Sequence, residues 1–159
     1  MNIRYYYFID EFNKKEIEKL SSQISLIYRN YNKKNDPKEL RKLVIYCKNN
    51  RRKVYISNNL KDAIKYNFDG LYIPSFHKQL RFHNIIKKNF EIIGSAHNAI
   101  ELKIKEKQGC TVIFLSPIFK NNKNKKFLDV IKTNLLKKLT KNQIVLLGGI
   151  NQKTIKKSK

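Results

Sequence analysis

Hydrophobic residues along this chain gather in seven short runs that show little alternation with polar residues. The runs are rich in Ile, Val, Tyr, Phe and Leu, and unbroken apolar runs of this length are typical of strands buried on both faces of a parallel sheet. We therefore predict seven parallel strands, at residues 4–10, 24–29, 53–57, 70–76, 90–95, 111–119 and 143–150.

The segments between these runs have the spacing of amphipathic helices. In the clearest of them Asp36 predicts an N-cap, Pro37 suits the first helical position, and Glu39 has the spacing of a capping box. One apolar stripe follows at i, i+3, i+4 and i+7, formed by Leu40, Leu43, Val44 and Cys47. A second stripe is formed by Leu128, Ile131 and Leu135. Further helices are predicted at 13–23, 60–67, 78–88 and 98–107.

Strands that alternate with helices predict an α/β fold, either a doubly wound sheet or a (β/α) barrel. A TIM-type barrel has eight strands, and the chain ends at residue 159, where the helix after the seventh strand would begin. We expect a single domain, 1–159, with a TIM-type barrel in which seven β/α strands are present and the eighth unit is missing. A fragment, an open barrel and closure by another chain remain alternatives, so a homo-oligomer stays open.

Composition narrows the class of protein. Hydrophobic residues make up 41% of the chain, which is typical of a globular protein. No apolar run approaches the roughly 18–20 residues of a membrane span, and the N-terminus lacks a signal-peptide pattern, so we expect a cytoplasmic protein without membrane contact. Cys47 and Cys110 form no CxxC pair, which predicts two reduced thiols and no metal site.

The formal net charge of +23 raises the alternative of a basic nucleic-acid-binding protein. The excess is mostly lysine, spread through every segment together with Asn and Ile, as A/T-rich codons would supply it. No RRM, KH, zinc-finger or helix-turn-helix signature is present. The sequence therefore disfavours nucleic acid as the partner, and the charge favours acidic small molecules.

Ligands of parallel β/α folds bind beyond the carboxyl ends of the strands. Arg29 at such an end can grip a phosphate with two hydrogen bonds, Gly148 and Gly149 can present backbone N–H groups, and Ser95 offers a hydroxyl. His97 is the group there that titrates near neutral pH. Each of these residues also has a purely structural interpretation. Arg29 can be surface charge, Gly148 and Gly149 a turn, Ser95 a helix cap and His97 a structural histidine.

Other catalytic schemes find less support. The chain contains no HExxH, GxSxG or P-loop motif. His77 and His83 lie six residues apart without carboxylates nearby, so we expect no metal site. Asp10 is the only acidic residue well placed for the mouth of a barrel, and a two-carboxylate site would lack its second member.

Five segments in order, VYISNNLKDA, FDGLYIPSF, IIGSAHNAIEL, FLSPIF and LLGGIN, resemble the thiamine phosphate synthase/TenI superfamily of β/α barrels over essentially the whole chain. The resemblance implies a role in thiamin biosynthesis and a thiazole phosphate bound at the barrel mouth. A synthase of this family, a transferase, joins the thiazole phosphate to hydroxymethylpyrimidine pyrophosphate with Mg²⁺. A TenI-type isomerase instead moves a proton on thiazole carboxylate phosphate, an aromatising tautomerisation without a metal.

Departures from the family pattern bear on which chemistry applies. Of the Gln, Arg and Lys after the second strand only Arg29 is kept, the Asn-Asp of the third strand reads Ser57-Asn58, and the second expected aspartate falls at about His77. Residues 120–126 replace the threonine-rich thiazole loop, and the final phosphate-binding strand is absent. Mg²⁺ needs hard oxygen ligands, so it is expected only if synthase activity is retained, with Asn58 among the binding residues.

His97 does agree with the family pattern, because it matches the proton-transfer histidine of the TenI type. The leading hypothesis is therefore a thiamin-pathway protein with His97 as its catalytic residue and Arg29, Asn58, Ser95, Gly148 and Gly149 as binding residues for phosphorylated thiazole or pyrimidine molecules. Two alternatives remain: a catalytically degenerate barrel that binds a phosphorylated ligand or a partner protein, and the basic nucleic-acid binder.

Overall fold

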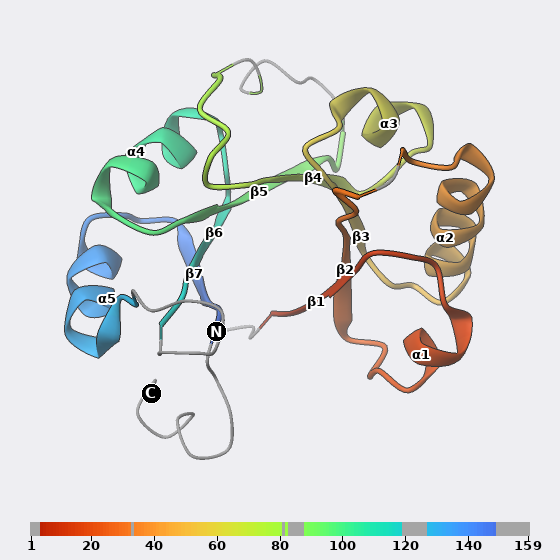
Figure 1. Ribbon diagram of the computed structural model, residues 1–159, viewed down its shortest axis with the longest axis horizontal. Helices are drawn as coiled ribbons and strands as arrows, with labels where there is room; N and C mark the ends of the chain where they lie inside the picture. Colours follow the sequence, from red (N-terminus) through yellow and green to blue (C-terminus); the bar gives the residue numbers. More distant parts are fainter. Residues whose placement is uncertain (1–3, 33, 81, 83–87, 119–126, 149–159) are drawn as a thin grey trace. The chain divides into compact units, whose positions relative to one another are not determined.

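The computed structural model describes residues 4–32, 34–80, 82, 88–118 and 127–148. Strands and helices succeed one another along these residues, as Figure 1 shows: β1 (Tyr5–Ile9), α1 (Lys14–Glu18), β2 (Ile24–Tyr28), α2 (Pro37–Asn49), β3 (Val54–Ser57), α3 (Leu60–Lys65), β4 (Gly70–Ile73), β5 (Glu91–Ala96), α4 (Ala99–Lys107), β6 (Val112–Leu115), α5 (Asp129–Lys138) and β7 (Gln143–Leu146). The chain divides into two compact units, Met1–Tyr72 with Lys87–Glu91, and Ile73–Ile86 with Ile92–Lys159.

The first unit is built on parallel strands that pair in chain order. β1 pairs with β2, β2 with β3, and β3 with β4, all in parallel. Their central residues are buried together with the inner faces of the helices that connect them, including Leu26, Ile27, Val54, Ile56, Leu71, Leu40 and Leu43. Polar side chains gather at the amino-terminal ends of these strands.

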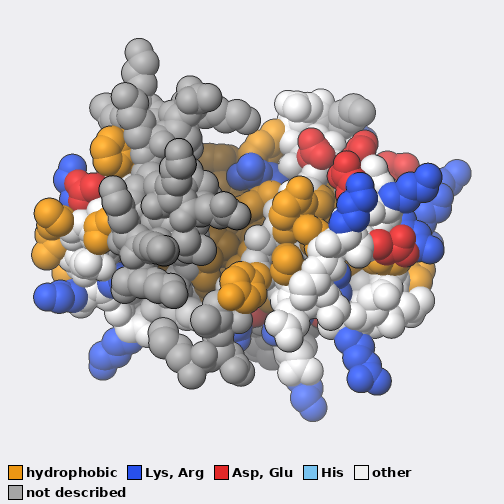
Figure 2. All heavy atoms as spheres, turned by 90° about the horizontal axis from the view of Figure 1, so that it is seen from below, with side chains coloured by type: hydrophobic (Ala, Val, Ile, Leu, Met, Phe, Trp, Pro, Cys, Tyr) orange, Lys and Arg blue, Asp and Glu red, His pale blue; other side chains and the backbone are white. Residues whose placement is uncertain are grey.

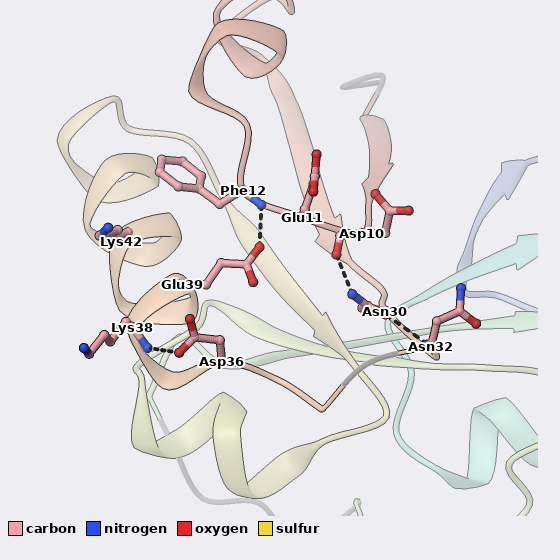
Figure 3. Close-up of a pocket in the computed structure, with 9 residues that line it drawn as sticks. All are labelled: Asp10, Glu11, Phe12, Asn30, Asn32, Asp36, Lys38, Glu39 and Lys42. Atoms are coloured by element: carbon pink, nitrogen blue, oxygen red, sulfur yellow. Dashed lines mark hydrogen bonds between the residues drawn. The ribbon is translucent and has the colours of Figure 1, made fainter.

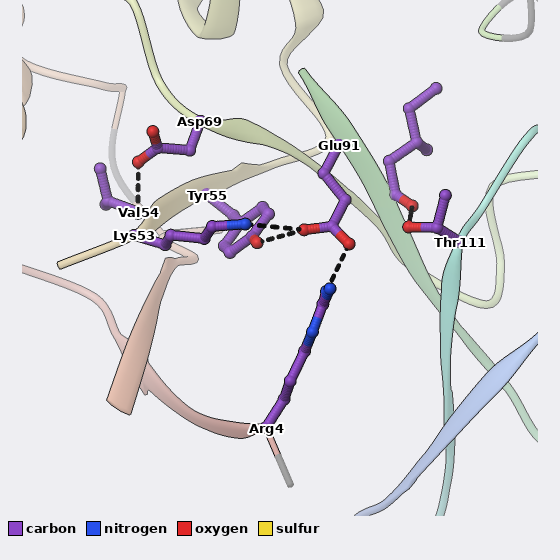
Figure 4. Close-up of polar contacts among 8 residues, drawn as sticks. Arg4, Lys53, Val54, Tyr55, Asp69, Glu91 and Thr111 are labelled. Atoms are coloured by element: carbon purple, nitrogen blue, oxygen red, sulfur yellow. Dashed lines mark hydrogen bonds and ion pairs between the residues drawn. The ribbon is translucent and has the colours of Figure 1, made fainter. Parts of the chain in front are cut away.

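That polar cluster centres on the Glu91 carboxylate, which is drawn in Figure 4. Arg4 Nη1 lies 2.5 Å from its Oε1, and the Tyr55 hydroxyl donates to its Oε2 at 2.6 Å. Lys53 Nζ lies 3.6 Å from the same Oε2. Gly70 lets the backbone of Glu91 approach, because a Cβ at residue 70 would lie 2.0 Å from the Glu91 carbonyl oxygen.

In the second unit β5 pairs with β6 and β6 with β7, again in parallel and in chain order. α4 follows β5, and α5 lies between β6 and β7 in the sequence. The core holds Ile93, Ala96, Val112, Ile113, Phe114 and Leu115 from the strands and Leu102 from α4.

Most of the predicted strands and helices are confirmed, although several are shorter than predicted. All seven predicted strands form, and α2 begins as predicted: the Asp36 side chain accepts from Lys38 N at 2.9 Å and Pro37 opens the helix. The capping box does not form, because Glu39 accepts instead from the backbone N of Phe12 at 2.6 Å. The four residues of the predicted stripe, Leu40, Leu43, Val44 and Cys47, are all buried.

Two helix predictions are wrong where the structure describes them. Residues 78–80, 82 and 88 are not helical; in 77–79, backbone carbonyls bond to side chains of α4. The stripe of Leu128, Ile131 and Leu135 is not the buried face of α5, since Ile131 is 75% and Leu135 is 58% exposed. Leu128 precedes the helix, and Thr133 and Leu136 are buried instead.

No described helix is long and apolar enough to span a membrane.

Candidate functional site

His97 directly follows β5, and both nitrogens of its ring have a hydrogen-bond partner. Nδ1 contacts the carbonyl oxygen of Ser116, which follows β6, and Nε2 lies 2.9 Å from Oγ of Ser75, which follows β4. A carbonyl oxygen can only accept, so we assign the proton to Nδ1, and the Ser75 hydroxyl then donates to Nε2. The ring is thus held as the tautomer in which Nε2 acts as a base.

The start of α4 fixes the backbone that carries this ring. Asn98 is the N-cap, and its side chain accepts from Glu101 N at 2.9 Å. Glu101 in turn accepts from the backbone N of His97 at 2.7 Å. The cap is therefore Asn98, and the plainer interpretation of Ser95 as a helix cap is wrong.

Ser95 itself lies within β5 and is 5% exposed. Its hydroxyl is therefore part of the strand rather than of the loop that follows. A role in binding substrate stays a prediction for this residue.

Two polar side chains buried on α4 support the segment after β4. Lys105 is completely buried, and its Nζ donates to the carbonyl oxygens of Pro74 at 2.7 Å and His77 at 2.8 Å, and to Gln108 Oε1 at 2.8 Å. Gln108 Nε2 donates to the carbonyls of His77 and Gln79. Burial lowers the pKa of Lys105 to about 8.

Sequence reasoning missed this pair. The signal was available in the helix period, since Lys105 and Gln108 continue the buried spacing that begins at Leu102. A lysine at an inward-facing position needs carbonyl or carboxylate partners, and those partners lie far away in the sequence.

Gly148, after β7, adopts φ +90, and a Cβ there would lie 3.1 Å from Pro117 Cα. Glycine therefore serves both the turn and the close approach to the segment after β6. Gly149 lies outside the described residues. Binding of phosphate by this glycine pair stays a prediction.

Arg29 and Asn58 belong to the first unit. The Arg29 guanidinium carbon lies 4.4 Å from the ring centroid of Phe8 and 5.7 Å from that of Tyr31, a cation–π arrangement that orients its planar fork. Asn58 is exposed, has φ +54, and donates its backbone N–H to the carbonyl of Tyr72. His97, Ser95 and Gly148 lie in the other unit, so a shared anion site stays a prediction.

The first unit contains a cavity of about 460 Å³ near the ends of β1 and β2 and the start of α2, drawn in Figure 3. It is lined by Asp10, Glu11, Phe12, Asn30, Asn32, Asp36, Lys38, Glu39 and Lys42. Asp10 thus shares this cavity with the carboxylates of Glu11, Asp36 and Glu39, whereas the sequence predicted no second carboxylate beside it. Four carboxylates beside two lysines favour a cationic or neutral ligand over a phosphate in this cavity.

Carboxylates around this cavity also affect their neighbours. Glu39 Oε2 accepts from the Tyr28 hydroxyl at 3.4 Å. Burial, together with the Glu39 charge, raises the pKa of Tyr28 to about 12.

A groove of about 750 Å³ in the second unit runs past His97 and along α5. Its walls are mainly apolar and include Ala99, Phe127, Leu128, Leu135, Leu136 and Leu139, with Asn98, Asp129 and Lys132 as polar members. His97 therefore lines a space large enough for a small heterocycle.

The residues expected to hold Mg²⁺ do not fit that ion. Asn58 offers a neutral amide, and the carbonyl of His77 already accepts from the Lys105 ammonium group. The His77 ring packs against Phe82 with centroids 5.2 Å apart. Within the described ranges no three His, Cys, Asp or Glu side chains are grouped to bind a metal. His83 lies outside those ranges. Burial raises the pKa of the Cys47 and Cys110 thiols to about 12.

Comparison with known proteins shows which family and which solved structures this chain is similar to. The model of the thiamine monophosphate synthase family matches residues 15–159. A thiamine phosphate pyrophosphorylase from Pyrococcus furiosus superposes with a TM-score of 0.73 at 16% identity, over 98% of this chain and 79% of that one. A U32 peptidase matches with a TM-score of 0.61 at 8% identity, over 90% of this chain and 67% of that one. No curated protein matches. The predicted α/β fold of TIM type, with seven parallel strands, is confirmed.

Proposed function

This chain belongs to the thiamine monophosphate synthase family, and from that membership we propose that it binds a phosphorylated thiazole and moves a proton on the thiazole ring. Membership supports a function related to thiamin biosynthesis. The reaction proposed is the aromatising tautomerisation of thiazole carboxylate phosphate, in which one proton leaves a ring carbon and one is returned elsewhere on the molecule.

The observation that carries the proposal is the orientation of His97. A general base needs a lone pair near the proton it removes and a fixed tautomer. The Ser116 carbonyl supplies the second condition by holding the proton on Nδ1, which leaves Nε2 as the base. The apolar groove beside His97 supports the binding of a heterocycle there.

For the phosphate we propose the residues that the family pattern retains. Arg29 would bind it through its planar guanidinium, and Gly148 and Gly149 through backbone N–H groups. Ser95 would act as a further hydrogen-bond donor. The TenI-type reaction is preferred over coupling because Asn58 and His77 lack the charge that Mg²⁺ requires.

Replacing His97 with asparagine tests the proposal. The wild type is expected to convert the non-aromatic tautomer of thiazole carboxylate phosphate to the aromatic one in the presence of EDTA, followed by absorbance. His97→Asn should lower kcat about 100-fold or more, since general acid–base catalysis typically contributes that much. Thr111→Ala is the control, because Thr111 lies at the amino-terminal end of β6 and its hydroxyl donates to the Ile92 carbonyl.

Two results would replace the proposal by an alternative. Turnover that appears only with hydroxymethylpyrimidine pyrophosphate and Mg²⁺ would assign the synthase reaction. A thermal shift with thiazole phosphate but no turnover of any kind would assign the catalytically degenerate barrel, which the altered metal positions Asn58 and His77 favour.

A further inference from the structure

We infer that Ser75 is a second catalytic residue, whose hydroxyl carries the proton between His97 and the bound thiazole. The inference rests on the proposed function and assigns a role in it to a residue that the family resemblance did not supply. Ser75 follows β4 and is half-buried, and its Oγ lies 2.9 Å from Nε2 of His97. The inference places the reacting carbon of the ligand beside this hydroxyl.

Both ring nitrogens of His97 are engaged, which determines where a proton can travel. Nδ1 faces the Ser116 carbonyl, and Nε2 faces Ser75 Oγ at 2.9 Å. A proton taken from a ligand therefore reaches Nε2 by way of the Ser75 hydroxyl. A serine hydroxyl donates one hydrogen bond and still has lone pairs to accept another, so it can give its proton to His97 while taking one from the ligand.

The step balances without a metal or a redox partner. The carbon-bound proton of the ligand moves to Ser75 Oγ as the Ser75 proton moves to His97 Nε2, which leaves an imidazolium and a carbanion delocalised over the thiazole system. In the return step Ser75 protonates the new position and recovers its proton from Nε2. After the return step the protonation states of Ser75 and His97 and the net charge are the same as at the start.

The position of Ser75 is fixed by the buried side chains of α4. Pro74 and His77, on either side of it in the sequence, each give a carbonyl oxygen to Lys105 Nζ, and His77 N donates to the Pro74 carbonyl at 3.1 Å to close the turn. Lys105 and Gln108 are both completely buried. A hydroxyl held on such a turn is preorganised for transfer, which matters because small displacements of reacting groups are costly.

Three variants separate a relay from direct action by His97. Ser75→Ala removes the hydroxyl, Ser75→Thr keeps a hydroxyl at the same place, and Thr111→Ala removes a hydroxyl from the opposite end of β6. Conversion of thiazole carboxylate phosphate is measured for each, with circular dichroism as the check on folding. We expect a loss of about 100-fold for Ser75→Ala, recovery to within about 10-fold of wild type for Ser75→Thr, and no change for Thr111→Ala.

A solvent isotope effect distinguishes proton transfer from mere positioning. With the ligand deuterated at the reacting carbon, so that abstraction is slow, a relay moves the exchangeable Ser75 proton in the same step. Abstraction should then run about two-fold slower in D₂O than in H₂O. Direct abstraction by His97 moves only the carbon-bound hydrogen and gives no such effect.

The outcomes are distinct. A wild type that never converts the thiazole overturns the proposed function and this inference with it. A wild type that converts it, while Ser75→Ala keeps its rate or the solvent isotope effect is absent, overturns the role of Ser75 alone.

Discussion

At the scale of single residues, the most consequential side chain is one of 35 Lys and Arg residues, and its buried position on α4 is marked in the sequence only by the helix period. Lys105 is completely buried, and its three hydrogen-bond acceptors are two backbone carbonyls and an amide rather than a carboxylate. Burying an ammonium group without an opposite charge favours its neutral form. The buried charge therefore lowers the stability of the fold at neutral pH. The same ammonium group fixes the segment around Ser75 by binding the carbonyls of Pro74 and His77.

This arrangement predicts a pH dependence of stability. The pKa of Lys105 is lowered from 10.5 to about 8 by burial. Between these values the unfolded chain binds more protons than the folded one, so the Lys105 contribution to the free energy of unfolding rises with pH, by about 3 kcal/mol in total. Urea unfolding of wild type and Lys105→Met, from pH 7.5 to pH 10.5, measures it.

The difference between the two proteins is the quantity to follow. Cys47 and Cys110, with pKa values raised to about 12, lower stability above their ordinary pKa of 9.0. The Lys105 charge lowers the pKa of Cys110, so removing Lys105 enlarges the Cys110 effect in the variant and adds to the difference in the same direction. The difference should move in favour of the wild type as pH rises. A difference that stays constant over this range would show that Lys105 is not buried as an ammonium group.

At the scale of elements, the ends of the helices carry more information than their apolar faces. Asn13, Asp36, Asn59 and Asn98 cap α1, α2, α3 and α4 with side-chain hydrogen bonds, and at the start of α5 the Asp129 side chain accepts from Lys132 N at 2.9 Å. A cap satisfies N–H groups of the first turn. The first four helices begin within one residue of where the sequence places them, whereas the apolar face of α5 is mispredicted.

For α2 this argument gives a direct test. Asp36→Ala removes the acceptor for Lys38 N and should lower the free energy of unfolding by about 1 kcal/mol. Asp36→Asn keeps an acceptor oxygen and should lie within a few tenths of a kcal/mol of the wild type. Chemical denaturation measures both, and equal losses for the two variants would assign the effect to the charge rather than to the cap.

At the scale of the whole molecule, the net charge of +23 calls for an account. On the face shown in Figure 2 the described Lys and Arg side chains lie at several separate places rather than in one patch. A nucleic-acid site concentrates its cations on one surface or in one groove. We therefore interpret the described cations of this face as dispersed surface charge.

Binding to random-sequence duplex DNA tests this interpretation. We expect weak association at about 20 mM salt that disappears by about 150 mM, because dispersed lysines give only counterion-release binding. Fluorescence anisotropy across a salt series measures it. Retention of tight binding at the higher salt would restore the nucleic-acid-binding alternative.

Prediction from sequence succeeded where the signal is local. The seven strands follow from contiguous apolar runs, and the start of α2 follows from Asp36 and Pro37, since both depend on neighbours within a turn or a strand. It failed at the described part of 78–88, where a helical spacing predicted a helix but the carbonyls of His77 and Gln79 bond to Lys105 and Gln108. Partners some thirty residues away leave no mark on a local pattern.

By itself, the sequence determined an alternating α/β chain with parallel strands, the family to which it belongs and the position of His97 after the fifth strand. The tertiary structure alone decided which groups hold that imidazole, because Ser75 and Ser116 reach its two ring nitrogens only when the segments after separate strands come together. The contacts of Lys105 with the carbonyls of Pro74 and His77 likewise form only in the folded chain. Hydrogen bonds between such groups depend on distances in space, and spacing along the chain does not encode those distances.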